Sequence, residues 1–238
     1  MRRCPDPGHA SVSAGASPRT QRDYRPKVCL VLTVEEIEDI LRVGHETPGF
    51  EFKGPGDRTD SYFFGKIARA ALSLGNLRDG GHIIIGIDDK DPAALQPGLN
   101  ETQLESWTDY DKIARTLAVY ADPPLRFDVE GMTLSIGARV AVMRIYEFAD
   151  VPHVCAKAYE GVLRQGALYV RPRKVPETSE VASSMEMRDV LDLAIEKGVR
   201  RFVQTAAHAG LALGPSGPTQ PSANDEERYA KERADAWS

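Results

Sequence analysis

The sequence has few cysteines and no long apolar run. Its three cysteines, Cys4, Cys29 and Cys155, lie far apart and form no CxxC pair, which excludes a disulfide framework and a cysteine-based zinc site. No stretch approaches the 18 apolar residues of a membrane span, and residues 1–24 lack the apolar segment of a secretory signal. We therefore expect a cytoplasmic protein with no membrane partner.

Several catalytic motifs are also missing. No GxxxxGK[ST] or GxGxxG follows a predicted strand, and no GxSxG occurs, so P-loop nucleotide hydrolysis and serine acyl transfer have no support. The formal net charge is −5, which excludes a polycation held to nucleic acid by overall charge. Any nucleic-acid site must be a local basic patch.

The length of 238 residues suits one domain with tails. Residues 1–30 mix Pro, Gly, Ser and Arg without periodicity and are predicted to be a disordered basic leader. Residues 205–238 are predicted to be a flexible tail, because from Ala209 onward the sequence has linker-like Pro, Gly and Ser. The domain is expected over 31–204, including a C-terminal helix.

Helix signals occur at four places. A capping box, Thr33 with Glu36, predicts a helix over 34–43. Asp60 is expected to cap a helix that closes near Gly75, and a further helix is expected over about 109–120. A second capping box, Ser183 with Glu186, predicts a last helix that ends at Gly198.

Strand signals alternate with these helices. Residues 50–53 alternate as a strand with one wet face, and residues 82–87 (HIIIGI) are typical of a buried central strand that follows a Gly-Gly turn. Strands are expected over 125–130 and 132–136, with a turn at Glu130–Gly131, over 138–147, and as a hairpin within 162–171. The irregular order predicts an α+β fold with a single mixed sheet.

The first candidate site combines carboxylates with a lysine. Glu51 and Lys53 share one strand face, Glu46 precedes them, and Asp88–Asp89 follow the apolar strand. If the two strands are neighbours, these side chains converge, and Glu46, Glu51 and Asp88 would offer Mg²⁺ or Mn²⁺ hard oxygen ligands. The alternative is a surface salt bridge, Glu51 to Lys53, beside an ordinary turn.

The second candidate site is a cationic run late in the chain. It comprises Arg164, Tyr169, Arg171, Arg173 and Lys174. Arginines at alternate positions with an aromatic beside them are expected to contact phosphates and stack on a base. Charges on a solvated strand end explain the run equally well.

Seven segments follow one another in an ordered series: FEFKG (50–54), KIARAALSLGN (66–76), GGHIIIGIDD (80–89), DPP (122–124), RVAVMRI (139–145), VPHV (151–154) and ALYVRPR (167–173). This ordered series resembles the Schlafen-type AlbA domain family. It spans about residues 34–182. One departure is that Pro172 and Arg173 replace the family's Arg-Gly ending, and another is the long segment 91–109.

The resemblance implies a nucleic-acid-associated domain. In vertebrate members the related core is a metal-dependent endonuclease of structured RNA such as tRNA, with two glutamates five residues apart and a later aspartate. Glu46 and Glu51 have that separation, and Asp88 or Asp89 follows. By resemblance these residues would bind Mg²⁺ or Mn²⁺, and Lys53 would offset phosphate charge. The family context implies a role in stress or phage defence.

Three hypotheses follow from these observations. The leading one is an RNA-binding endoribonuclease, with DNA as the other candidate substrate. The second is a non-catalytic DNA-binding or transcription-regulatory module, and the third is a protein-interaction subunit with an acidic core. A homodimer is compatible with each.

Overall fold

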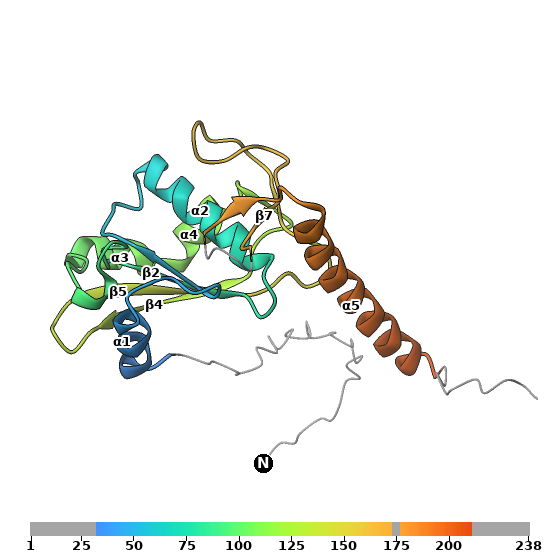
Figure 1. Cartoon of the computed structure of the whole chain (residues 1–238), viewed down its shortest axis with the longest axis horizontal. Coiled ribbons are helices and arrows are strands. Elements are labelled where there is room, and N and C mark those ends of the chain that lie inside the picture. Colours follow the sequence, from blue (N-terminus) through green and yellow to red (C-terminus); the bar gives the residue numbers. More distant parts are fainter. Residues whose placement is uncertain (1–31, 173–176, 211–238) are drawn as a thin grey trace, which may run out of the picture. The chain divides into compact units, whose positions relative to one another are not determined.

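The computed structural model describes residues 32–172 and 177–210, and most of the expected leader and tail lies outside this range. The fold is α+β, as predicted (Figure 1). The helical elements are α1 (Val34–Arg42), α2 (Ser61–Gly75), η1 (Pro92–Ala94), α3 (Glu101–Thr108), α4 (Tyr110–Leu117) and α5 (Ser184–His208). The strands are β1 (Phe50–Lys53), β2 (Gly81–Ile85), β3 (Ala121–Asp122), β4 (Phe127–Thr133), β5 (Arg139–Ile145), β6 (Val154–Cys155), β7 (Tyr169–Val170) and β8 (Ser179–Glu180).

A mixed four-stranded sheet lies at the centre, in the order β1-β2-β5-β4. β1 and β2 are parallel, and the other pairs are antiparallel. Two small antiparallel pairs, β3 with β6 and β7 with β8, complete the strand pairing. The parallel pair places the C-terminal ends of β1 and β2 at the same end of the sheet, which decides where the candidate site lies.

Helix α2 joins β1 to β2 and supplies much of the core. Asp60 caps it by accepting hydrogen bonds from the backbone N–H groups of Tyr62 and Phe63, as predicted. Its inward side chains pack with β2 and β5 in one apolar cluster. The predicted helix over 34–43 and the buried strand over 82–87 are likewise confirmed, as α1 and β2.

The Gly-Gly pair before β2 is required by close backbone packing. Gly80 has φ +69°, and a Cβ atom there would lie 2.1 Å from the carbonyl oxygen of Ile145. Any larger residue would push β2 and β5 apart at their paired ends. The pair therefore acts as a turn.

The turn expected at Glu130–Gly131 is wrong. β4 runs through both residues, because Gly131 serves helix packing instead: a Cβ atom there would lie 3.0 Å from Leu104 of α3. The chain reverses later, where Leu134 N–H donates to Ala138 O and Gly137 adopts φ +86°. β4 and β5 thus form one long hairpin.

The hairpin expected within 162–171 is also wrong. Tyr169 and Val170 pair with Glu180 and Ser179 of β8, and residue 163 makes only an isolated bridge with Tyr159. The strand that pairs with β7 is β8, which lies further along the chain. The alternation of apolar and polar residues within 162–171 does not indicate which strand will pair with it.

The last helix does not end at Gly198, as expected, but runs to His208. Gly198 has an ordinary helical setting with open space around it, and ion pairs from Lys197 to Glu147 and from Arg201 to Asp150 tie this stretch to the domain. The expected boundary at 204–205 falls inside α5. Within residues 32–172 and 177–210, no helix is long and apolar enough to cross a membrane.

Asn76, at the end of α2, joins three segments of the resemblance. Its buried side-chain amide donates to the carbonyl oxygens of His153 (2.8 Å) and Tyr169 (3.0 Å) and accepts from His153 N–H (2.8 Å). A buried amide that makes all these bonds fixes the relative positions of α2, the 151–154 segment and β7.

Replacing Asn76 with Asp is expected to lower the free energy of unfolding by at least about 2 kcal/mol, because two buried carbonyls lose their donor. Urea denaturation measures this. Asn100→Asp is the matched control: Asn100 caps α3 by accepting from Gln103 N–H, which Asp also does. Equal urea midpoints for the two variants would contradict the proposal that Asn76 holds α2, the 151–154 segment and β7 together.

His82 predicts a pH dependence of stability. It is buried, stacks on Phe50 at 5.2 Å and lies beside Arg144, and burial followed by the Arg144 charge lowers its pKa from 6.5 to about 4. The unfolded chain takes up a proton at His82 below pH 6.5, whereas the folded chain does so only near pH 4. The free energy of unfolding is therefore expected to fall as the pH is lowered from 6.5 to about 4. This fall should be shallower in His82→Phe, which retains the stacking on Phe50. Equal pH slopes for both proteins would refute it.

Candidate functional site

The predicted carboxylate site meets its first geometric requirement. β1 and β2 are adjacent and parallel, and Gly86 and Ile87 N–H donate to the Lys53 carbonyl oxygen (2.8 and 3.1 Å). Asp88–Asp89 follow directly. The chain thus brings Lys53 and the two aspartates to the same end of the sheet.

Glu51 is held between two cations. Its side chain is 9% exposed; one carboxylate oxygen pairs with Lys53 Nζ and the other with the Arg171 guanidinium. The expected wet face of residues 50–53 is therefore wrong, because these side chains turn inward to one another.

Arg171 connects β7 to this cluster. Its side chain is fully buried and donates to the carbonyl oxygens of Thr47 (3.1 Å) and Phe50 (3.0 Å), and it lies 3.8 Å from Glu46 Oε2. Burial lowers the pKa of Arg171, and the negative charge of Glu46 opposes this. Arg171 thus positions Glu46 and Glu51.

The pKa of Lys53 also depends on charges across the site. Burial lowers its pKa most, the charges of Glu46 and Asp89 raise it, and Arg69 lowers it. Glu46 Oε1 accepts from Phe52 N–H at 3.0 Å. Asp88 is exposed and accepts from Lys90 N–H at 3.0 Å in a local turn. Of the two aspartates, Asp89 is the one whose charge acts on Lys53.

The three predicted metal ligands, Glu46, Glu51 and Asp88, already have other partners in this arrangement. Both oxygens of Glu51 contact cations, one oxygen of Glu46 is bonded to the backbone, and Asp88 is engaged in its turn. Within the described ranges, no group of three His, Cys, Asp or Glu side chains could hold a metal ion. Mg²⁺ or Mn²⁺ would compete here with Lys53 and Arg171.

The predicted nucleic-acid residues do not form one exposed patch. Arg164 is exposed and pairs with Glu180 (2.8 Å). Tyr169 is 2% exposed, and its hydroxyl accepts from Arg164 N–H. The expected surface position of Tyr169 and Arg171 is wrong, because both side chains are buried when β7 packs beside α2. Arg173 and Lys174 lie outside the described residues.

A different cationic surface lies on α2 and was missed. Tyr62, Lys66 and Arg69 follow one another at i, i+4 and i+7 on one helix face. We refer to these three residues as the α2 cationic face. Tyr62 is 50% exposed, and Lys66 Nζ lies 4.5 Å from its ring centroid. The spacing is visible in the sequence, within a helix that was predicted.

Arg69 links the α2 cationic face to the carboxylate site. It donates to Thr178 O at 2.9 Å, lies 5.5 Å from the Tyr169 ring centroid, and lowers the pKa of Lys53 through its charge. Its Nε is buried and has no hydrogen-bond partner among the described residues. The charge of Arg69, on the α2 cationic face, therefore acts on Lys53 of the carboxylate site.

Comparison with protein-family models and with curated proteins finds no match. Among solved structures, the chain is similar to the DIP2311 protein from Corynebacterium diphtheriae, with 18% identity and a TM-score of 0.42. The alignment covers 62% of this chain and 26% of that one.

Replacing Arg171 with Met is expected to lower the free energy of unfolding by about 3–5 kcal/mol, because Glu51 would remain as a buried charge without that partner. Arg164→Met removes an exposed partner of Glu180 and is expected to have a much smaller effect. Urea denaturation of both variants measures the difference. Similar losses would show that the Glu51–Arg171 pair is not the stronger interaction.

Proposed function

We propose that this chain is a Schlafen-like nucleic-acid-binding protein, with RNA as the favoured ligand. The bound nucleic-acid strand would cross the α2 cationic face. The observation that carries the proposal is an exposed tyrosine with two cations on one helix face. Lysine and arginine bind phosphates, and an exposed aromatic ring offers a surface on which any base can stack.

The pairing of the cations supports this choice of surface. Several exposed cations lie 2.7–2.9 Å from carboxylates, namely Arg42, Lys112, Arg164 and Arg200. In the part of the chain that the structure describes, neither Lys66 nor Arg69 has a carboxylate at ion-pair distance. The exposed charge of Lys66 is available for a phosphate backbone, and the half-buried Arg69 adds its charge beside it, despite the negative net charge of the chain.

RNA cleavage is the second candidate function. It is favoured by the convergence of Glu46, Lys53 and Asp89 at the end of the parallel strands, beside the α2 cationic face. A strand that crosses that face would pass close to Lys53, whose charge suits a phosphate. The carboxylates pair with cations or backbone groups as they are arranged, so metal-dependent cleavage would require them to exchange these partners for the ion.

A partner other than nucleic acid would use a different surface. Homodimerisation stays a prediction, and the surface on which it would rest is the outer face of α5, where Leu191, Ile195, Val199 and Phe202 are exposed. A DNA-binding regulator and a protein-interaction subunit are the competing functions, and each gives a distinct result in the following experiment.

Binding of labelled tRNA and of single-stranded RNA and DNA is measured by fluorescence anisotropy at several salt concentrations. The double variant Lys66→Gln/Arg69→Gln is expected to weaken single-stranded RNA binding at least tenfold. The slope of log Kd against log salt should also fall by about 1.4, which corresponds to two lost phosphate contacts. Tyr62→Ala should weaken binding with little change in slope, because stacking involves no charge.

The matched control is Arg115→Gln, on the exposed side of α4. It removes one exposed charge that is not part of the α2 cationic face and should bind as the wild type does. Equal weakening by the control would mean that only net charge matters, and the proposed surface would be wrong. Absence of binding to any nucleic acid would favour a protein-interaction subunit, and tighter binding to DNA would favour a regulator.

The same tRNA is incubated with Mn²⁺, Mg²⁺ or EDTA and analysed on denaturing gels. Cleavage that EDTA and Asp89→Asn abolish would establish the nuclease hypothesis, and Asp89 is exposed, so this variant is expected to fold. Intact RNA in every lane, with binding retained, would leave a non-catalytic binding protein.

A further inference from the structure

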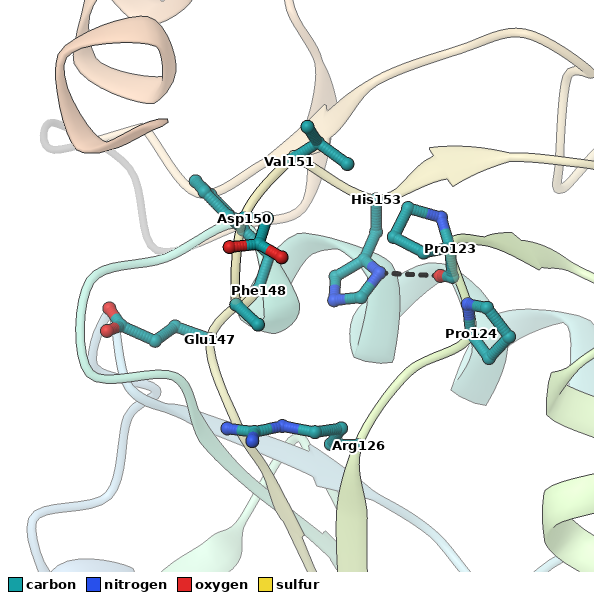
Figure 2. Close-up of a pocket in the computed structure, with 9 residues that line it drawn as sticks. Pro123, Pro124, Arg126, Glu147, Phe148, Asp150, Val151 and His153 are labelled. Carbon is teal, nitrogen blue, oxygen red and sulfur yellow. Dashed lines mark hydrogen bonds between the residues drawn. The ribbon is translucent and has the colours of Figure 1, made fainter. Parts of the chain in front are cut away.

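A small pocket lies between the Pro123–Pro124 segment and residues 147–153 (Figure 2). Its volume is about 190 Å³, below the roughly 300–1,000 Å³ of sites that enclose a whole drug-sized ligand. The walls include Pro123, Pro124, Phe148 and Val151. A space of this size with apolar walls suits one planar ring.

His153 presents an unused acceptor to this pocket. The residue is 3% exposed, and its Nδ1 lies 2.7 Å from the carbonyl oxygen of Pro123. A carbonyl can only accept, so Nδ1 carries the hydrogen. Burial lowers the pKa of His153, so the ring is neutral at pH 7 and Nε2 is an acceptor. Figure 2 shows this nitrogen directed into the pocket, and no described residue hydrogen-bonds to it.

Asn76 and Gly75, at the end of α2, fix the position of His153. Asn76 holds its backbone N–H and carbonyl, and Gly75 leaves room for the imidazole: a Cβ atom there would lie 2.7 Å from His153 Cδ2. The acceptor is therefore held in place before any ligand arrives, which reduces the entropic cost of binding.

Arg126 supplies the charge of the pocket. It lies across the pocket from His153 in Figure 2 and is exposed. The lining carboxylates already have cationic partners, since Glu147 pairs with Lys197 and Asp150 with Arg201. Among the described residues, Arg126 has no carboxylate at ion-pair distance. It can therefore bind an anionic group.

We infer that this pocket binds one nucleotide. Its base lies between the proline and phenylalanine walls, a base N–H donates to His153 Nε2, and Arg126 binds the phosphate. The same chemistry has two sources, a free nucleotide or an unpaired nucleotide of a bound strand. The second source rests on the proposed function, whereas the first does not.

The test uses the full chain labelled with ¹⁵N and adenosine 5′-monophosphate as the probe. Long-range ¹H–¹⁵N spectra are expected to show His153 with its proton on Nδ1, and the Nε2 resonance should shift when the nucleotide is added. Ribose 5-phosphate, which lacks the base, should leave it unchanged. Purine riboside 5′-monophosphate, which lacks the exocyclic amine, should bind about tenfold more weakly by calorimetry.

A protein variant tests the anion contact without disturbing the core. Arg126→Gln is expected to weaken adenosine 5′-monophosphate binding about tenfold. The control Lys157→Gln removes an exposed cation that does not line the pocket and should bind as the wild type does. Equal affinity for the two purine nucleotides, or an unshifted Nε2 resonance, would overturn the proposal.

A single-stranded oligoadenylate distinguishes the two sources. If it shifts the Nε2 resonance and Arg126→Gln abolishes the shift, the pocket takes a nucleotide of a bound strand. If only the mononucleotide does so, the pocket serves a free nucleotide. RNA binding that depends on Lys66 and Arg69 without any Nε2 shift refutes the pocket alone, whereas mononucleotide binding without RNA binding refutes the proposed function alone.

Discussion

The ion pair between Glu51 and Arg171 is the interaction on which the candidate site depends. It joins β1, near the start of the domain, to β7, near its end, and Arg171 also donates to the carbonyl oxygens of Thr47 and Phe50. Two charges removed from water are stabilising only when their remaining hydrogen-bonding groups are satisfied. Here Arg171 Nη1 donates to both carbonyls, whereas its buried Nε has no hydrogen-bond partner among the described residues. The loop that carries Glu46 is therefore held against β1 by the same guanidinium that neutralises Glu51.

Local signals predicted much of the fold. Capping residues placed the starts of α1, α2 and α5, and the β-branched run placed β2, because these features act over a few residues. Two of the errors concern glycines whose role is set by distant contacts. Gly131 makes room for α3 within a strand, and Gly198 lies inside a helix that distant ion pairs stabilise. No local pattern separates such glycines from those that end an element.

The candidate site was predictable in part, for the same reason. The alternation of β1 placed Glu51 and Lys53 together, and the adjacency of β1 and β2 brought Asp88–Asp89 to the same end. The role of Arg171 could not be read from spacing, because its partners lie more than a hundred residues away. From the sequence, an arginine near a tyrosine on a short strand is as compatible with an exposed cationic face as with a buried ion pair. The packing of β7 decides between these two arrangements.

The hydrogen bonds of the cluster have a further consequence for the sheet. β1 is an end strand. The carbonyls of Gly49, just before it, and of Lys53 accept from the β2 segment, so the backbone groups of Phe50 and Phe52 face outward. All four of these outward groups are occupied: Phe50 N–H donates to Thr47 O, Arg171 donates to Phe50 O, Lys53 donates to Phe52 O, and Glu46 accepts from Phe52 N–H. An open strand edge invites pairing with another chain, and charged side chains are a common means of preventing it. The same charges that suggest catalysis therefore protect the sheet from edge-to-edge aggregation, whatever ligand the protein binds.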